Sequence, residues 1–212
     1  MFVANAYLSP HPEPMRFLDP DTLPAELLAT LRAVEEQTGK DVVLIDMTAD
    51  TGIPTTLAYA ADPDGRYLRG CGTSLSRAHS IDRAVTELLQ SLLADTGYRD
   101  ERLQDISRLH SHPALHRCAA LDLDQADAPR VLVAFQDTPA PGTPALHLAE
   151  LHDRLASCGF TAYTSIRKAL SNGVTTVHVQ VPRLERFLLV TDGSLVLPGP
   201  RILDTLQREP HL

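Results

Sequence analysis

Hydrophobic and polar positions along the chain predict helices that alternate with strands. Apolar residues recur at helical spacing in several stretches, and short apolar runs bounded by turn residues are typical of strands. The helices are expected at residues 22–39, 80–94, 146–159 and 202–207, and the strands at 42–45, 55–60, 131–135, 161–166 and 174–181. The runs at 42–45 and 131–135 are of the kind that is covered on both faces. This alternation indicates an α/β fold with helices layered on a mixed sheet.

The pattern is least regular before residue 21 and between residues 98 and 118. Phe2 and Val3 favour a short first strand, and the prolines up to Pro20 predict an extended segment after it. Residues 62–65, Asp-Pro-Asp-Gly, have the chemistry of a turn. Residues 98–118 are polar with little periodicity, so no element is expected there.

The sequence contains a possible internal repeat of two helix–strand–strand units. In the first, a helix ending at Gly39 and a strand are followed by a turn at Gly52; in the second, the corresponding glycines are Gly159 and Gly173. The two glycine pairs are spaced almost equally. A duplicated unit explains this spacing, and chance coincidence is the alternative.

Composition limits the class of protein. With 212 residues, 43% hydrophobic and 22% charged, the sequence fits one globular domain over residues 1–212. Its net charge of −8 argues against nucleic acid or an anionic membrane as partner. No apolar segment is long enough to span a membrane, and neither Lys40 nor Lys168 belongs to a P-loop. Three cysteines without a C-x-x-C pair indicate reduced thiols and a cytoplasmic protein.

The stretch from residue 70 to 92 carries the most specific pattern. Gly70 and Gly72 precede a polar turn and an amphipathic helix for which Ser80 is the predicted N-cap. The stripe of this helix that should be buried consists of Ile81, Ala84, Val85, Leu88, Leu89 and Leu92.

A second face of this helix carries Arg83, Glu87 and Gln90. On spacing alone, these side chains could form an ordinary solvated face, with an Arg–Glu pair worth less than about 1 kcal/mol. The alternative is that a cation, a carboxylate and an amide beside a glycine turn form part of a binding site.

Five elements in chain order resemble those of the YcaO family. The central one is glycine-x-glycine followed, about ten residues later, by Arg-Ala-x-x-Glu-x-x-Gln. The other four are Thr22-Leu23-Pro24, the D-x-T-x-D-x-G-I-P run of residues 46–54, the V-x-V-x-V-P-x-L-E-like run of residues 177–185, and Gly199-Pro200-Arg201. The resemblance covers residues 20–201, and it implies a YcaO-like fold of half-domain size.

The resemblance implies ATP-dependent modification of peptide backbones, as in azoline-forming cyclodehydratases. Such chemistry requires carboxylates for Mg²⁺ and polar groups for the phosphates. Glu87 is then the candidate Mg²⁺ ligand, and Gln90 is an amide that orients a phosphate or the metal. Arg83 pairs with phosphate oxygens or holds Glu87 in place, and Gly70 and Gly72 permit close approach of a nucleotide. The implied partners are a precursor peptide and a second YcaO-like or leader-binding protein, or further copies of this chain.

The sequence also departs from the family pattern. The acidic S-x-x-x-E-x-x-E-R element is absent from these residues, Leu92 stands where an arginine is usual, and the last residues are not a proline-rich tail. The nearest internal substitute is the E-x-x-D-R run from Glu150 to Arg154. Two hypotheses follow: a partner chain completes the ATP site, or the chain is a non-catalytic peptide-binding or assembly subunit.

Two further groups of residues have candidate chemistry. His110, His112, His116 and Cys118 could bind Zn²⁺, although nine histidines are expected to cluster somewhere in a chain of this length. Cys71, between the two glycines, could be a nucleophile, but a buried neutral thiol is the favoured interpretation.

Overall fold

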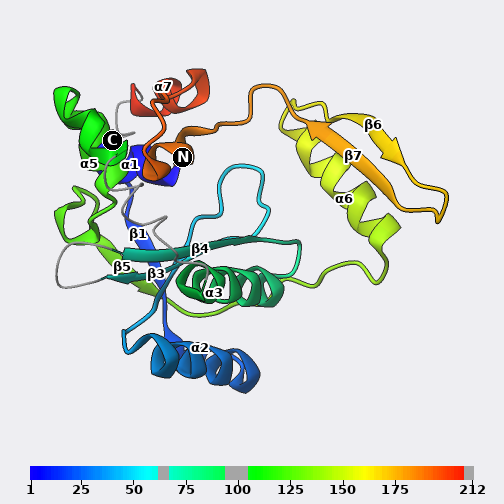
Figure 1. Ribbon diagram of the computed structural model, residues 1–212. Coiled ribbons are helices and arrows are strands. Elements are labelled where there is room, and N and C mark those ends of the chain that lie inside the picture. Colours follow the sequence, from blue (N-terminus) through cyan, green and yellow to red (C-terminus); the bar gives the residue numbers. More distant parts are fainter. Residues whose placement is uncertain (62–66, 94–104, 208–212) are drawn as a thin grey trace.

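Five strands form a mixed sheet at the centre of the molecule (Figure 1). The computed structural model describes residues 1–61, 67–93 and 105–207. The strand order is β4-β3-β2-β1-β5; β1 and β5 are parallel, and the other neighbouring pairs are antiparallel. The strands are β1 (Met15–Leu18), β2 (Val43–Asp46), β3 (Thr55–Ala61), β4 (Tyr67–Thr73) and β5 (Arg130–Val133).

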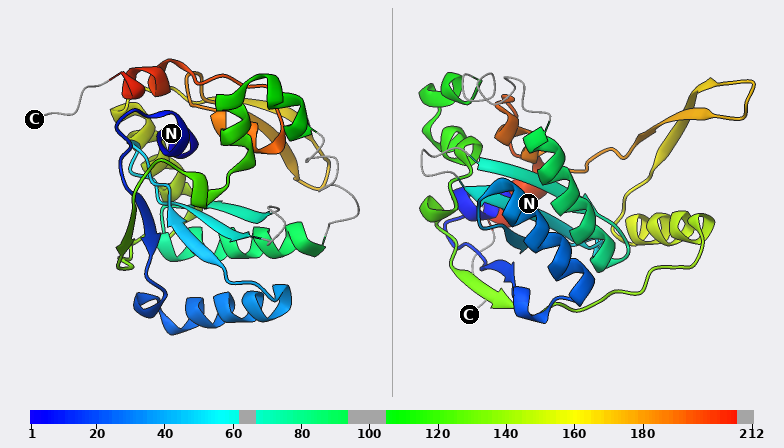
Figure 2. Two further views of the ribbon diagram at one scale, coloured as in Figure 1. Left: turned by 90° about the vertical axis from the view of Figure 1, so that its left-hand side faces the viewer. Right: turned by 60° about the horizontal axis from the view of Figure 1, so that its bottom comes forward.

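Helices cover both faces of this sheet (Figure 2). One face carries α2 (Ala25–Thr38) and α3 (Arg77–Leu93). The other carries α1 (Phe2–Leu8), α5 (Pro113–Ala120), the 3-10 helix η4 (Phe187–Asp192) and α7 (Pro200–Leu206). Shorter 3-10 turns are η1 (Pro20–Thr22), η2 (Arg108–Ser111) and η3 (Leu123–Gln125).

Two apolar clusters hold these layers together. Side chains alternate along a strand, so Leu44 and Ala58 belong to the cluster beneath α2 and α3, whereas Ile45 and Leu57 belong to the cluster on the other face. The prediction that 42–45 is covered on both faces is therefore confirmed. So is the predicted fold class, an α/β fold with helices layered on a mixed sheet.

The remaining elements form an arm that projects from this body, at the right of Figure 1. The arm, residues 144–180, consists of α6 (Pro144–Ser157), β6 (Tyr163–Ala169) and β7 (Thr175–Gln180). β6 and β7 form a separate two-stranded antiparallel sheet.

The helix–strand–strand order of the possible internal repeat is present in the structure. The backbone is left-handed at all four glycines, with φ of 65° at Gly39 and Gly52, 76° at Gly159 and 85° at Gly173, a conformation that favours glycine. The surroundings of the two units differ, because β2 and β3 lie inside the main sheet while β6 and β7 stand alone. A common origin of the units stays a prediction.

The structure corrects the prediction near the N-terminus. Residues 2–8 form a helix instead of a strand, and Val3, Ala6 and Tyr7 lie on its buried side. The extended segment that follows contains β1.

Two later predictions are also corrected. The polar region 98–118 contains the start of α5, with Pro113 at its first position, where a missing backbone N–H costs nothing. The run at 131–135 is not a covered strand, because β5 forms an edge of the sheet and Leu132 is 66% exposed. The turn predicted at 62–65 lies outside the described residues.

Candidate functional site

Helix α3 lies directly on strand β4 at Gly70 and Gly72, which have no side chains. A Cβ atom at Gly70 would lie 2.1 Å from the carbonyl oxygen of Ala84, and one at Gly72 would lie 1.9 Å from that of Ser80. Both distances are far inside van der Waals contact, so only glycine permits this approach. The space beside these glycines is thus filled by α3, so a nucleotide cannot approach them from that side. Their predicted role toward a nucleotide stays a prediction.

The buried stripe of α3 agrees with the prediction, but the start of the helix does not. Ile81, Ala84, Val85 and Leu88 are at most 1% exposed. The helix begins at Arg77, so Ser80 is an interior residue and not the N-cap. Its buried hydroxyl donates to the carbonyl of Arg77 at 2.9 Å and lies 2.9 Å from the hydroxyl of Thr56 in β3.

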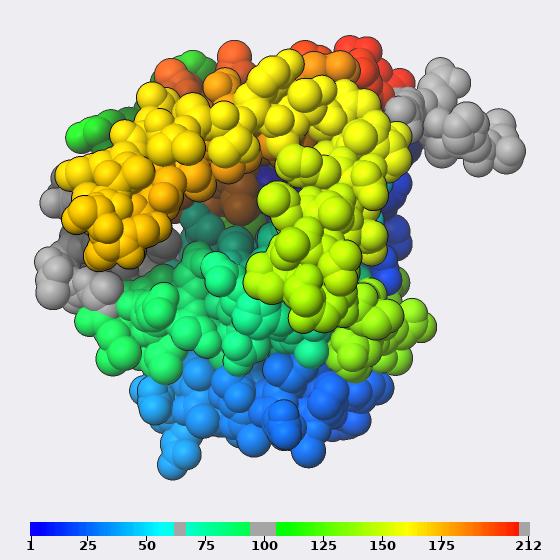
Figure 3. Space-filling model, turned by 90° about the vertical axis from the view of Figure 1, so that its right-hand side faces the viewer, coloured from blue at the N-terminus to red at the C-terminus, as the bar shows by residue number. Residues whose placement is uncertain are grey.

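Arg83, Glu87 and Gln90 lie together on the exposed side of α3. None of the three lines either of the cavities described below. In the space-filling view, α3 forms one wall of a hollow that is bounded by the β6–β7 hairpin and α6 (Figure 3). A carboxylate and an amide on an open helix face fit the needs of Mg²⁺, which takes one or two protein carboxylates and completes its shell with phosphates and water. The role of each residue stays a prediction.

Cys71 is a half-buried thiol on β4. Burial raises its pKa above the ordinary value; Arg69 opposes this shift, and the negative charge of Glu87 adds to it. Since the thiolate is the reactive form, the favoured interpretation of Cys71 as a neutral thiol agrees with its environment.

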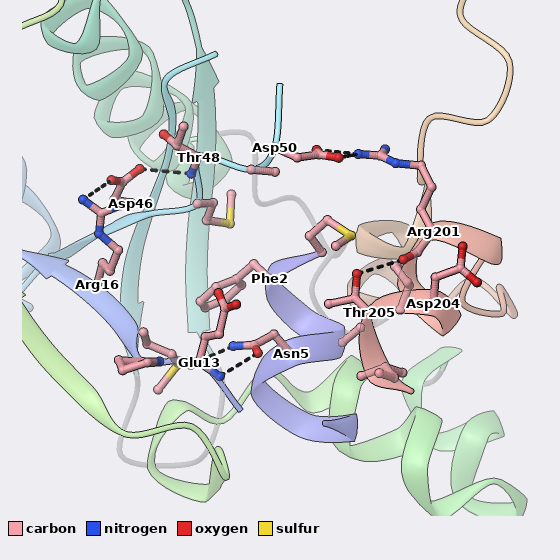
Figure 4. Close-up of a pocket in the computed structure, with 18 residues that line it drawn as sticks. Phe2, Asn5, Glu13, Arg16, Asp46, Thr48, Asp50, Arg201, Asp204 and Thr205 are labelled. Atoms are coloured by element: carbon pink, nitrogen blue, oxygen red, sulfur yellow. Dashed lines mark hydrogen bonds and ion pairs between the residues drawn. The ribbon is translucent and has the colours of Figure 1, made fainter. Parts of the chain in front are cut away.

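A second group of polar residues surrounds the carboxylate of Asp46, which lies at the end of β2 and begins the D-x-T-x-D run. Its side chain is 1% exposed and forms ion pairs with Arg77 at 3.0 Å and with Arg16 at 3.4 Å. It also accepts the backbone N–H of Thr48 at 3.0 Å (Figure 4). Burial pushes the pKa of Asp46 upward, but the hydrogen bonds from Thr48 and Arg77 outweigh it and hold that pKa below its usual value. The carboxylate thus joins β1, β2 and the start of α3.

The loop of residues 46–50, which follows β2, also contacts the last family element. Asp50 forms an ion pair with Arg201 of the G-P-R element (Figure 4). Glu185, which ends the V-P-x-L-E-like element, accepts the backbone N–H of Gly199 at 3.0 Å and that of Ile202 at 3.2 Å. It therefore satisfies two of the N–H groups at the start of α7, where a negative charge is also favoured by the helix dipole.

These contacts enclose a cavity of about 420 Å³ between α1, the 46–50 loop and α7 (Figure 4). Its polar lining includes Arg16, Asp46, Thr48, Asp50 and Arg201. A neighbouring cavity of about 200 Å³ lies between the same loop and Glu185. Sequence reasoning identified residues 46–54, 177–185 and 199–201 only as family elements and did not predict that they lie close together.

The proposed acidic substitute in α6 has a structural role. Glu150 pairs with Arg154 at 2.7 Å, and Arg154 donates to the carbonyl of Gly52 at 2.7 Å. Cys158 contacts the carbonyl of Asp50 at 3.6 Å. These contacts attach the base of the arm to the 46–54 loop.

The zinc alternative is wrong. Among residues 1–61, 67–93 and 105–207, no three His, Cys, Asp or Glu side chains are grouped so that they could hold a metal ion. His110 and His116 stack on each other, with ring centroids 4.2 Å apart. Cys118 is fully buried in α5, where burial raises its pKa to about 12.

Residues 3–185 match the model of the family described as YcaO cyclodehydratase, ATP- and Mg²⁺-binding. The chain belongs to the YcaO family. Two solved structures have a similar fold. The first, a heterocyclase in complex with substrate and cofactor, has a TM-score of 0.56 and 21% identity over 80% of this chain and 23% of its own. The second, the heterocyclase TruD, has a TM-score of 0.54 and 19% identity over 88% of this chain and 26% of its own.

This YcaO chain spans about a quarter of the length of those two heterocyclases. The sequence matches none of the curated proteins. In the part of the chain that the structure describes, no helix is long and apolar enough to cross a membrane.

Proposed function

We propose that this YcaO protein is a component of a ribosomal-peptide modification system, located in the cytoplasm. In this proposal it contributes part of a Mg²⁺–ATP site for activation of a backbone amide, by cyclodehydration to an azoline or a related product. A partner chain supplies the rest of the site. The observation that carries the proposal is the match of residues 3–185 to an ATP- and Mg²⁺-binding family. The open face of α3, which carries Arg83, Glu87 and Gln90, supports a site that a partner chain completes.

The proposed roles of the α3 side chains follow from their chemistry. Mg²⁺–ATP, when bound, supplies the phosphoryl group that turns an amide oxygen into a leaving group. Glu87 would hold the Mg²⁺ ion through its carboxylate, since carboxylate oxygen is the protein ligand that Mg²⁺ prefers. Gln90 would orient a phosphate or a metal-bound water through its amide. Arg83 would pair with phosphate oxygens or keep the Glu87 carboxylate in place.

Titration calorimetry with Mg²⁺–ATP tests this proposal. The full chain is titrated alone and again with the products of neighbouring genes, in wild-type form and as Glu87→Ala. Thr86→Ala is the matched control, because Thr86 is an exposed neighbour on the same helix. We expect binding heat only in the presence of a partner, unchanged in Thr86→Ala and lost in Glu87→Ala.

Two outcomes would contradict the shared site. Binding that survives in Glu87→Ala would remove Glu87 from the site. The absence of nucleotide binding in every mixture would leave the alternative from the sequence, a peptide-binding or assembly subunit with a degenerate YcaO fold.

A further inference from the structure

The β6–β7 hairpin of the arm repeats the strand pairing of β2 and β3 in the same register. The residues of β2 and β6 lie at equal distances along the chain after Gly39 and Gly159, and those of β3 and β7 at equal distances after Gly52 and Gly173. The equivalent pairs are Val43–Tyr59 and Tyr163–Gln180, Leu44–Ala58 and Thr164–Val179, Ile45–Leu57 and Ser165–His178, and Asp46–Thr56 and Ile166–Val177. Over these four pairs, each position of the second hairpin therefore has an equivalent in the first.

One face of the first hairpin is covered by α2 and α3. On this face, Leu44 and Ala58 belong to the apolar cluster that contains the buried stripe of α3. Asp46, on the same face, pairs with Arg77 at the start of α3. The equivalent face of the second hairpin consists of Thr164, Ile166, Val177 and Val179. The apolar face of the second hairpin is therefore the one that helices cover in the first.

In the part of the chain that the structure describes, no layer covers this apolar face. Ile166 is 70% exposed, Val177 52% and Val179 54%, and α6, β6 and β7 contain no buried residue. On the opposite face, Ser165 and His178 hold the places of two core residues of the first hairpin, so that face is suited to water. An isolated two-stranded sheet is marginally stable, and an exposed apolar surface marks an interaction site. The hairpin therefore lacks a cover on one face only.

The first hairpin shows which elements form such a cover. After β3 the chain continues into β4, which pairs with the outer edge of β3, and then into α3, which lies on β4 at Gly70 and Gly72. After β7 the chain continues into η4 and α7, which lie on the main sheet (Figure 2). Within the described ranges, β7 pairs with β6 alone. The second hairpin thus lacks the equivalent of the strand–helix unit β4–α3, while α6 holds the place of α2 before it.

We propose that a second YcaO-like chain covers the β6–β7 hairpin with a strand–helix unit equivalent to β4–α3. Its strand pairs with the free edge of β7, and its helix packs on Ile166, Val177 and Val179. Another copy of this chain cannot supply the unit, because its own β4 and α3 are already packed on its β3. The hairpin borders the hollow beside α3 (Figure 3), so the bound chain lies next to the face that it is proposed to complete. The inference names the partner of the proposed function, and in that respect it rests on that function.

Sedimentation velocity tests the inference on the full chain mixed, without nucleotide, with the YcaO-like product of a neighbouring gene. We expect a one-to-one complex. Ile166→Glu should raise its dissociation constant at least about 100-fold, because the helix of the partner would bury an unpaired carboxylate. Ser165→Glu is the matched control, since it places the same charge one residue away on the polar face, and it should leave the complex intact. Both positions are exposed, so neither change disturbs the core of the chain itself.

Hydrogen exchange tests the strand pairing separately from the helix contact. A strand added to the free edge of β7 gives partners to backbone N–H groups that otherwise face solvent. We expect amide exchange in β7 to slow at least about 10-fold in the complex.

The outcomes are distinct from those of the nucleotide experiment. The absence of a complex with every such chain would overturn the inference, as would a complex that forms equally well with Ile166→Glu and Ser165→Glu or leaves exchange in β7 unchanged. Self-association of the chain alone that Ile166→Glu abolishes would also overturn it, because a second copy would then cover the face. If the complex forms as expected and binds no Mg²⁺–ATP, the proposed function fails and the interface stands. If Mg²⁺–ATP binds to a complex that tolerates Ile166→Glu, the function stands and the interface fails.

Discussion

Replacing Gly72 by alanine tests whether the glycines of β4 serve helix packing. The added Cβ would lie 1.9 Å from the carbonyl oxygen of Ser80 and 2.7 Å from the amide nitrogen of Ala84. Both atoms belong to the backbone of α3, so no rotamer change can relieve the clash. To restore a contact of at least 3.0 Å with the Ser80 oxygen, the helix must move by about 1 Å.

This displacement of the helix determines how much stability Gly72→Ala loses. The α3 stripe is packed against the sheet with exposed fractions of at most 1%. A gap of 0.5–1 Å forfeits roughly a quarter to a half of each van der Waals contact, and overpacking in cores costs about 1–3 kcal/mol or more. We expect Gly72→Ala to lower the free energy of unfolding by about 3 kcal/mol. For a chain of this size, that corresponds to a fall in Tm of about 6–12 °C.

Thermal and urea unfolding, followed by circular dichroism, measure this cost. Gly142→Ala is the control, because a Cβ there has no neighbour within 4 Å; it should change stability by less than about 1 kcal/mol. Nucleotide binding is measured on the same proteins in the presence of the partner. If Gly72→Ala is as stable as wild type but loses nucleotide, the packing argument is refuted and the glycine contacts the ligand.

The remaining predictions concern the Asp46 carboxylate. Asp46→Ala should lower the free energy of unfolding by about 3 kcal/mol, because it leaves the nearly buried Arg77 without its carboxylate partner. Arg16→Ala changes a side chain that is 54% exposed, so it should lower the free energy of unfolding by less than about 1 kcal/mol. Urea denaturation of both variants measures the two losses. Because the folded-state pKa of Asp46 is lowered, its contribution is complete above the unfolded-state pKa and is lost as pH falls through the folded-state value. The difference between wild type and Asp46→Ala should therefore shrink in acid, and an equal difference at pH 7 and pH 3 would contradict this assignment.

Local patterns made the helices and inner strands predictable. The i, i+3, i+4 spacing of Ile81, Ala84, Val85 and Leu88 identified the buried side of α3, because this spacing depends only on the geometry of the helix itself. Gly39 likewise ended α2, with the left-handed φ of 65° that favours glycine at this position.

Features that depend on distant partners were not predictable in the same way. The apolar run at 131–135 resembles a covered strand, yet its exposure follows from its place at the sheet edge, which is a property of the topology. The sequence predicted that Gly70 and Gly72 permit close approach of a nucleotide. Glycine alone does not distinguish a ligand from a helix, and α3 occupies the space where a Cβ would point at both positions. The partners of Asp46 come from β1 and α3, which only the fold brings together.

The position of β1 has a consequence for the order in which the molecule folds. β2, β3, β4 and α3 are neighbours both in the chain and in space, whereas β1 must pair with β5, as Met15 does with Arg130. Closing a long loop is entropically unfavourable and slow, so contacts of low sequence separation form first. We therefore expect the β2–α3 block to assemble early and the C-terminal segment, whose Arg201 pairs with Asp50, to pack onto it later.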